Sequence, residues 1–293
     1  MSQSASSSQS FHPNFNIDVL PVIFMVDTTL FKIDASRLSN HCTLLKNMLF
    51  DSKEIGLSAE GSSVEQPIII PDCTADVFAN FCGWLYQVGW HEDPAEHAQQ
   101  LIDVLHVCHR YDISAGIKLA SEELLRPRFN LVPSRRLSLA LCYGLQSWIN
   151  DAVRALIALP PRSYTPTDLN YLGAPIYHLL FTAKDNILVE RQKVANFPCY
   201  PRNGDASPWC ADHEQCEQVW TCKWLTVIAR EIHNTVTPLE LADIPHRLHI
   251  ADHAGVTPEC KSAFLEYINS LPQLRKEEEL TVQVVEAITA FCN

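Results

Sequence analysis

Two short apolar runs separated only by turn residues constrain the fold of this chain more than any other feature. The runs occupy residues 23–26 and 30–33, and the polar residues Asp27, Thr28 and Thr29 lie between them. This spacing predicts a β-hairpin, because strands joined by a tight turn pair with each other. A hairpin has one face to bury, so later segments must supply apolar residues that cover it.

The residues after the hairpin predict helices and one further strand. The apolar residues of 44–49 recur at helical spacing, and a loop rich in glycine and serine follows at 56–63. The run Ile68-Ile69-Ile70 before Pro71 predicts a third strand, and the apolar spacing becomes helical again from Thr74. We therefore expect an α+β fold, with a small sheet flanked by helices.

The same residues resemble the BTB/POZ domain in three segments. Phe31-Lys32-Ile33 leads to Leu38 and Ser39, as in the family's second strand and the segment after it. The segment 67–72 precedes Phe78 and Trp84-Leu85-Tyr86, and 101–111 is similar to the family's leucine-rich helix that ends in tyrosine. The chain has Asp34 at a position where many family members carry a histidine. The charged-pocket functions seen in those members are therefore not assigned to this chain.

The remainder of the chain predicts helices without strands. Apolar stripes begin at Pro133, and the prolines at 160–161 and at 175 mark helix ends and starts. The first of these helices are similar in pattern to the BACK-type extension of many BTB proteins. The rest resembles the helical region that follows the BTB domain in many proteins of mushroom-forming fungi. The expected division is a disordered tail (1–14), a BTB/POZ-like domain (15–128), a helical extension (129–195) and a helical C-terminal region (196–293).

Composition excludes several classes of partner. A net charge of −12 is unfavourable for binding nucleic-acid phosphates. No apolar run reaches the length of a membrane span, and the Ser/Gln-rich N-terminal residues lack the features of a signal peptide. Eleven cysteines without such a signal are typical of reduced thiols. We expect an intracellular protein, cytoplasmic or nuclear, with neither nucleic-acid nor membrane partners.

One cluster has the composition of a metal site. Cys210, His213, Cys216 and Cys222 are spaced C-x2-H-x2-C-x5-C, and thiolates with imidazole are the ligands that zinc prefers. Four protein ligands leave no open coordination position, so the site would be structural. Cys199 is an alternative ligand in the preceding loop. The other interpretation is that Cys216 and Cys222 are ordinary core residues beside tryptophans.

Catalytic scaffolding is missing from the sequence. The chain contains no G-x-S-x-G nucleophile elbow, no G-x-x-x-x-G-K-[S/T] phosphate loop and no G-x-G-x-x-G turn. We therefore expect no enzyme and no cofactor other than the structural zinc. The alternative is a metal- or thiol-dependent enzyme with its site in residues 196–260.

The BTB/POZ resemblance implies noncatalytic protein–protein interaction. Such domains occur as dimerisation units and as adaptors that recruit substrates to cullin-type ubiquitin ligases. The resemblance thus implies a homodimer and a cullin-type scaffold as partners. The expected interaction surface consists of Leu44, Leu45, Met48, Trp84 and Trp90. The alternative for the two tryptophans is that they pack beneath the helix that begins at Pro94.

Overall fold

A computed structural model describes residues 21–42, 47, 60–200, 210, 212–234 and 236–292. The described residues are mainly helical and include one three-stranded sheet, so the fold class is α+β. The chain divides into two compact units, Met1–Leu131 and Val132–Asn293. The expected boundary between the helical extension (129–195) and the C-terminal region (196–293) lies inside the second unit. The expected tail (1–14) and the expected helix at 44–49 lie outside what the structure describes, residue 47 excepted.

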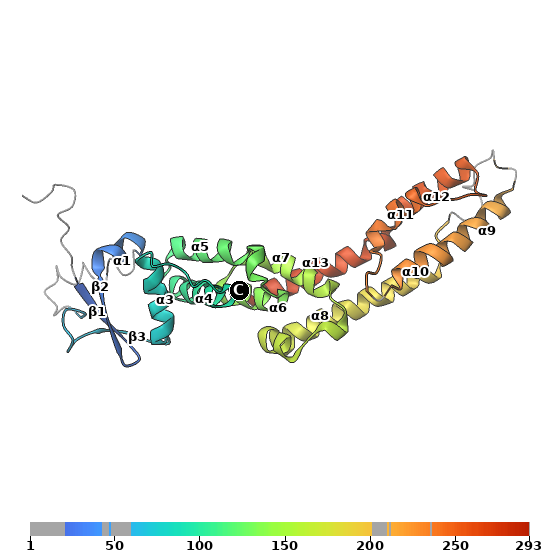
Figure 1. Ribbon diagram of the computed structural model, residues 1–293. Helices are drawn as coiled ribbons and strands as arrows, with labels where there is room; N and C mark the ends of the chain where they lie inside the picture. The colour runs from blue at the N-terminus through green and yellow to red at the C-terminus, as the bar shows by residue number, and fades with distance from the viewer. Residues whose placement is uncertain are drawn as a thin grey trace, which may run out of the picture. The chain divides into compact units, whose positions relative to one another are not determined.

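The sheet has the order β2-β1-β3 and is formed by β1 (Pro21–Val26), β2 (Thr29–Asp34) and β3 (Ile68–Ile70) (Figure 1). β1 and β2 are antiparallel, whereas β3 is parallel to β1. Asp27 in the hairpin turn has φ of 51°, a left-handed backbone that aspartate adopts more readily than most residues. The predicted hairpin and the predicted third strand are confirmed.

The helix α1 (Ala35–His41) begins directly after β2, and Asp34 caps it. The Asp34 carboxylate accepts hydrogen bonds from the amide and the hydroxyl of Ser36, at 3.0 and 2.8 Å. The Asp34 amide in turn donates to the Tyr86 hydroxyl at 2.8 Å. An acidic N-cap satisfies amides that a helix leaves unpaired. Asp34, the position at which the BTB/POZ resemblance departs, therefore has a local structural role.

The described part of the first unit also contains the helices α3 (Ala75–Leu85), α4 (Pro94–Arg110) and α5 (Ser114–Leu124), and a short 3-10 turn follows at Pro127–Phe129. Thr74 caps α3 and Asp93 caps α4 through their side-chain oxygens. Apolar residues of the sheet, of α1, α3 and α4, and of the turn before α5 form one core that includes Phe24, Val26, Phe78, Phe81 and Val104.

The helices α4 and α5 approach each other closely at Gly116. A Cβ atom placed on Gly116 would overlap Sγ of Cys108, a fully buried residue of α4. It would also lie 3.3 Å from Cη2 of Trp84. Only glycine fits this contact, because the interior is packed too tightly to absorb another methyl group.

The second unit consists of helices and short turns. The helices are α6 (Pro133–Tyr143), α7 (Gln146–Ala158), α8 (Pro166–Asn196), α9 (His213–Lys223), α10 (Ala229–Ile232), α11 (Ile244–Ile250), α12 (Pro258–Ser270) and α13 (Lys276–Thr289). A π-helical segment, Trp224–Ile228, joins α9 to α10. Four 3-10 turns lie at Pro161–Ser163, Leu241–Asp243, Pro272–Arg275 and Ala290–Cys292. The long α8 is interrupted at Gly173, whose φ is 72°, and continues from Pro175 as predicted.

The helix α13 returns along α7 and α8 (Figure 1). Two ion pairs connect these helices. Arg154 of α7 holds both carboxylate oxygens of Glu278, at 2.6 and 2.7 Å, and Arg191 of α8 binds Glu277. The second pair is mostly buried, so losing one partner would leave a charge poorly solvated.

Two buried tryptophans attach α9 and the π segment to the end of α8. The ring N–H of Trp220 donates to the Cys199 carbonyl at 3.1 Å, and that of Trp224 donates to the Ala195 carbonyl at 3.2 Å. Phe264 of α12 packs on Trp220 with ring centroids 4.9 Å apart. This core places the starts of α9 and α12 together at one end of the second unit (Figure 1).

Candidate metal centre

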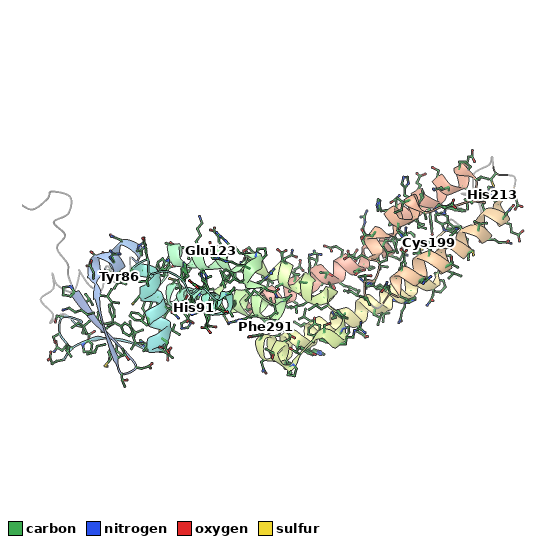
Figure 2. The ribbon with its side chains drawn as sticks, viewed as in Figure 1. Tyr86, His91, Glu123, Cys199, His213 and Phe291 are labelled. Atoms are coloured by element: carbon green, nitrogen blue, oxygen red, sulfur yellow. The ribbon has the colours of Figure 1, made fainter. Side chains whose placement is uncertain are left out.

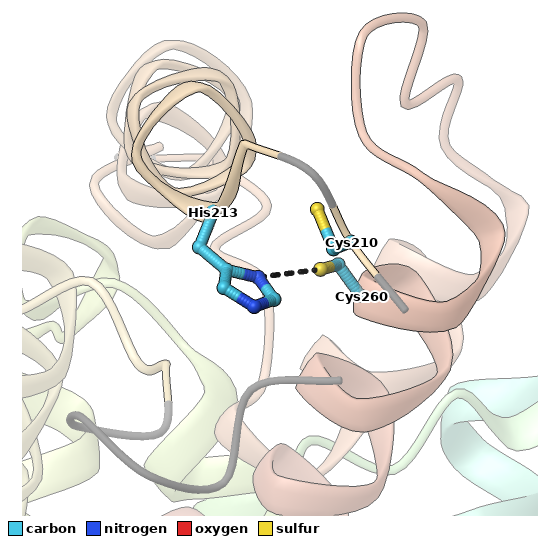
Figure 3. Close-up of side chains that lie close together, drawn as sticks. All are labelled: Cys210, His213 and Cys260. Atoms are coloured by element: carbon cyan, nitrogen blue, oxygen red, sulfur yellow. Dashed lines mark hydrogen bonds between the residues drawn. The ribbon is translucent and has the colours of Figure 1, made fainter. Parts of the chain in front are cut away.

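Cys210, His213 and Cys260 form a candidate metal-binding cluster. Their ligand atoms all lie within 4.8 Å of one another. Figure 3 shows the His213 ring and the Cys260 thiol pointing toward each other, with the Cys210 thiol beside them. The Cys260 sulfur lies 3.4 Å from Nδ1 of His213.

Cys216 extends the cluster on one side. Its sulfur lies 3.7 Å from the Cys210 sulfur, and its side chain is buried. The backbone amide of Thr257 donates to the Cys216 sulfur at 3.4 Å. An amide that donates to sulfur stabilises the thiolate and orients it, as the outer shell of metal sites commonly does.

The two measured separations match the edges of a zinc tetrahedron. With Zn–S of about 2.3 Å and Zn–N of about 2.0 Å, two sulfur ligands lie about 3.8 Å apart, and a sulfur and a nitrogen lie about 3.5 Å apart. The observed sulfur–sulfur distance is 3.7 Å and the sulfur–nitrogen distance is 3.4 Å. The chemistry of these side chains and these two separations are compatible with a metal ion, and Cys210, His213 and Cys260 are the residues whose ligand atoms all lie within 4.8 Å of one another.

Helix capping positions the ligands. His213 is the first residue of α9, and the Asp212 carboxylate caps that helix by accepting from the Gln215 amide at 3.0 Å. Cys260 lies in the first turn of α12, where its own amide donates to the hydroxyl of the N-cap Thr257. Two helix N-termini thus face the cluster, and their partial positive charge favours thiolates.

The thiols of the cluster differ in acidity. Partial burial opposes ionisation of Cys210. Even so, hydrogen bonds with the Thr257 hydroxyl, the Asp212 amide and the Cys260 and Cys216 thiols hold the pKa of Cys210 below its ordinary value. Burial raises the pKa of Cys260 to about 11. Cys210 therefore ionises more readily than Cys260, and a bound cation would have to displace the proton of Cys260.

The structure does not bring Cys222 or Cys199 into the cluster. Cys222 is exposed at the last turn of α9 and lies in a surface hollow with Glu214 and Glu217. It follows Cys216 by six residues, which corresponds to about 240° around a helix, so the two side chains point to different sides. The Cys199 thiol donates to the Phe197 carbonyl at 3.4 Å, and burial raises its pKa to about 11.

Cys260, and not Cys222, lies in the cluster, and it is the candidate ligand that the sequence pattern missed. It lies 47 residues after His213, far beyond the spacing of compact zinc motifs. The sequence does predict a helix start at Thr257-Pro258, which puts Cys260 in a first turn. What the sequence lacks is any local sign that this helix start lies beside that of α9.

The tryptophans of the expected interaction surface pack within the first unit. The half-buried Trp84 ring lies 5.8 Å from that of Phe81 and 5.4 Å from that of His41. Trp90 stacks on His97 of α4 at 4.9 Å, which corresponds to the packing alternative. Leu44, Leu45 and Met48 lie outside the described residues.

The loop after α3 exposes a different apolar side chain. Val88 is 64% exposed, and its amide donates to the Gly83 carbonyl at 2.8 Å. Gln87 has φ of 55°, and its amide donates to the Trp84 carbonyl at 3.1 Å. These two bonds form a Schellman motif, which ends the helix and holds Val88 outward.

Comparisons with known proteins leave the family of the chain open. No family model matches the chain, and neither a curated protein nor a solved structure matches it. None of the helices that the structure describes combines the length and the apolar composition needed to cross a membrane.

Proposed function

We propose that the chain is a noncatalytic protein-interaction module of the BTB/POZ type. The observation that carries the proposal is the order of elements in the first unit. The hairpin β1–β2 is followed by α1, then by β3 parallel to β1, then by α3 and the helical hairpin α4–α5. This is the order that the BTB/POZ resemblance implies, together with a sheet flanked by helices.

The proposed partners are a second copy of the chain and a cullin-type scaffold, in the cytoplasm or the nucleus. In this proposal the first unit binds the scaffold, and the helical second unit presents a substrate or acts as a spacer. The loop after α3 supports a contact surface, since Val88 and Tyr86 leave apolar area exposed on an ordered turn. Figure 2 labels Tyr86 on this part of the first unit.

We expect Val88→Glu to weaken binding to a purified cullin N-terminal domain by about tenfold or more, because a charge buried in an apolar contact costs upward of about 1.4 kcal/mol. Val64→Glu is the matched control. Val64 is 57% exposed in the first unit but lies outside the loop after α3. Its replacement should leave the affinity unchanged.

Sedimentation of the full chain, alone and with the cullin domain, measures both proposed associations. A chain that stays monomeric at micromolar concentrations contradicts the homodimer. A chain that forms no complex with the cullin domain contradicts the adaptor role. Equal losses of affinity for the cullin domain in Val88→Glu and Val64→Glu would mean that the loop after α3 is not the contact surface.

A second proposal is that Cys210, His213, Cys216 and Cys260 bind structural zinc. It is supported by the tetrahedral edge lengths and by the amide donated to Cys216. A set of three thiolates and one imidazole has no position left for a reactive water. This favours a structural site over the alternative of a metal-dependent enzyme in residues 196–260. Zinc would hold the starts of α9 and α12 together.

A further inference from the structure

Two thiols of the candidate metal centre are in contact but differ in accessibility. The Cys210 and Cys216 sulfur atoms lie 3.7 Å apart, which is a contact and not a bond. Cys216 is 2% exposed, whereas Cys210 is half-buried and open to small solutes. One thiol is therefore reachable from solvent, and a second one is directly behind it.

The two cysteines differ in their place relative to α9. Cys216 belongs to α9, and its amide donates to the Asp212 carbonyl at 3.4 Å. Cys210 precedes the helix and is free of its hydrogen-bond ladder. Forming a disulfide requires the two sulfur atoms to approach from 3.7 Å to roughly 2.05 Å.

We propose that Cys210 and Cys216 are an oxidisable pair, which hydrogen peroxide converts into a disulfide that excludes the metal ion. The Cys210 thiolate attacks one peroxide oxygen, the O–O bond breaks, and the leaving hydroxide takes a proton to become water. The Cys216 sulfur then attacks the resulting sulfenic acid, forms the S–S bond and expels a second water. The two thiols lose two electrons, and these reduce one hydrogen peroxide to two waters.

The disulfide and the metal ion compete for the same sulfur atoms. Metal binding needs thiolates, and a disulfide leaves only His213 and Cys260 as ligands. Bound metal should conversely protect the pair from oxidation. The metal part of this inference rests on the proposed zinc site, whereas the disulfide part requires only the two adjacent thiols.

The test uses the full chain with Cys222→Ser, treated with hydrogen peroxide with and without added zinc. Tryptic cleavage after Arg202 and Lys223 releases residues 203–223, in which Cys210 and Cys216 are then the only cysteines. Alkylation of free thiols and mass spectrometry measure the disulfide, and a zinc-binding dye measures released metal. We expect an unalkylated peptide lighter by two hydrogen atoms, one zinc released per disulfide, and reversal of both by dithiothreitol.

The controls separate the two proposals. The Cys216→Ser variant in the same background should give no disulfide within the peptide. Alkylation of both cysteines after peroxide treatment of the zinc-free chain, or a disulfide that joins the peptide to Cys260, would overturn the inference. So would a disulfide that forms while zinc stays bound. A chain that never holds zinc refutes the metal site alone, and the mass of the peptide still decides whether the thiols pair.

Discussion

Replacing Gly116 by alanine should destabilise the first unit by about 3 kcal/mol, at the upper end of the usual penalty for overpacking a core. The added methyl group would overlap the Cys108 sulfur and press on Trp84. Cys108 is fully buried, and the half-buried Trp84 packs against Phe81 and His41, so the packing would have to shift to admit the methyl group. Thermal melting should detect the loss, and hydrogen exchange should locate it in α4 and α5.

Two further variants test the cause of this loss. Cys108→Ala removes the overlapping sulfur, so the double variant should recover part of the stability that Gly116→Ala loses. Gly83→Ala is the matched control on α3, where nothing lies within 4 Å of the added Cβ. It should stabilise the chain slightly, because alanine favours a helix by up to about 1 kcal/mol over glycine. Similar destabilisation by both glycine variants would argue against the close approach of α4 and α5.

Removing metal is expected to produce the other large effect. A ligand present at about a thousandfold excess over its Kd adds about 4 kcal/mol to the stability of the folded state. For a unit of this size that corresponds to a Tm difference on the order of 10 °C. A chelator should therefore lower the Tm of the zinc-loaded chain. The combined variant Cys210→Ser and Cys260→Ser should show the same loss and no response to chelator.

Cys222→Ser serves as the control for the cysteine variants. Cys222 is exposed and lies outside the cluster, so its replacement should leave both the Tm and the chelator response unchanged. The second unit should still fold without metal, because Trp220 and Trp224 already attach α9 and the π segment to α8. Loss of zinc binding in the Cys222→Ser variant would contradict this account and would support the ligand set predicted from the sequence, which includes Cys222.

Local signals in the sequence were sufficient for most elements of the fold. The hairpin follows from two apolar runs around Asp27, helical spacing resumes at Thr74, where α3 begins, and Thr257 is a cap of α12 that the sequence predicts. Each of these signals lies within a few residues of the element that it starts. Capping and turn formation depend on neighbouring residues, so a single sequence contains the information needed.

Contacts between distant segments were not predictable in the same way. The zinc pattern named Cys222 because this cysteine is close to Cys216 in the sequence. Cys260 joins the cluster only because α9 and α12 pack through Trp220 and Phe264. The contact of Trp84 with Gly116 likewise joins residues that are far apart in the sequence. The π segment at Trp224–Ile228 has no sequence signal that we recognise.

The metal content and ligand set of the purified full chain test the proposed zinc site most directly. Mass spectrometry of the elements gives the stoichiometry, and X-ray absorption at the zinc edge identifies the ligand atoms. We expect one zinc per chain, with three sulfur ligands at about 2.3 Å and one nitrogen at about 2.0 Å. A chain that takes up no zinc, or a zinc ion bound mainly through oxygen and water, would contradict the assignment of Cys210, His213, Cys216 and Cys260 as a closed structural site.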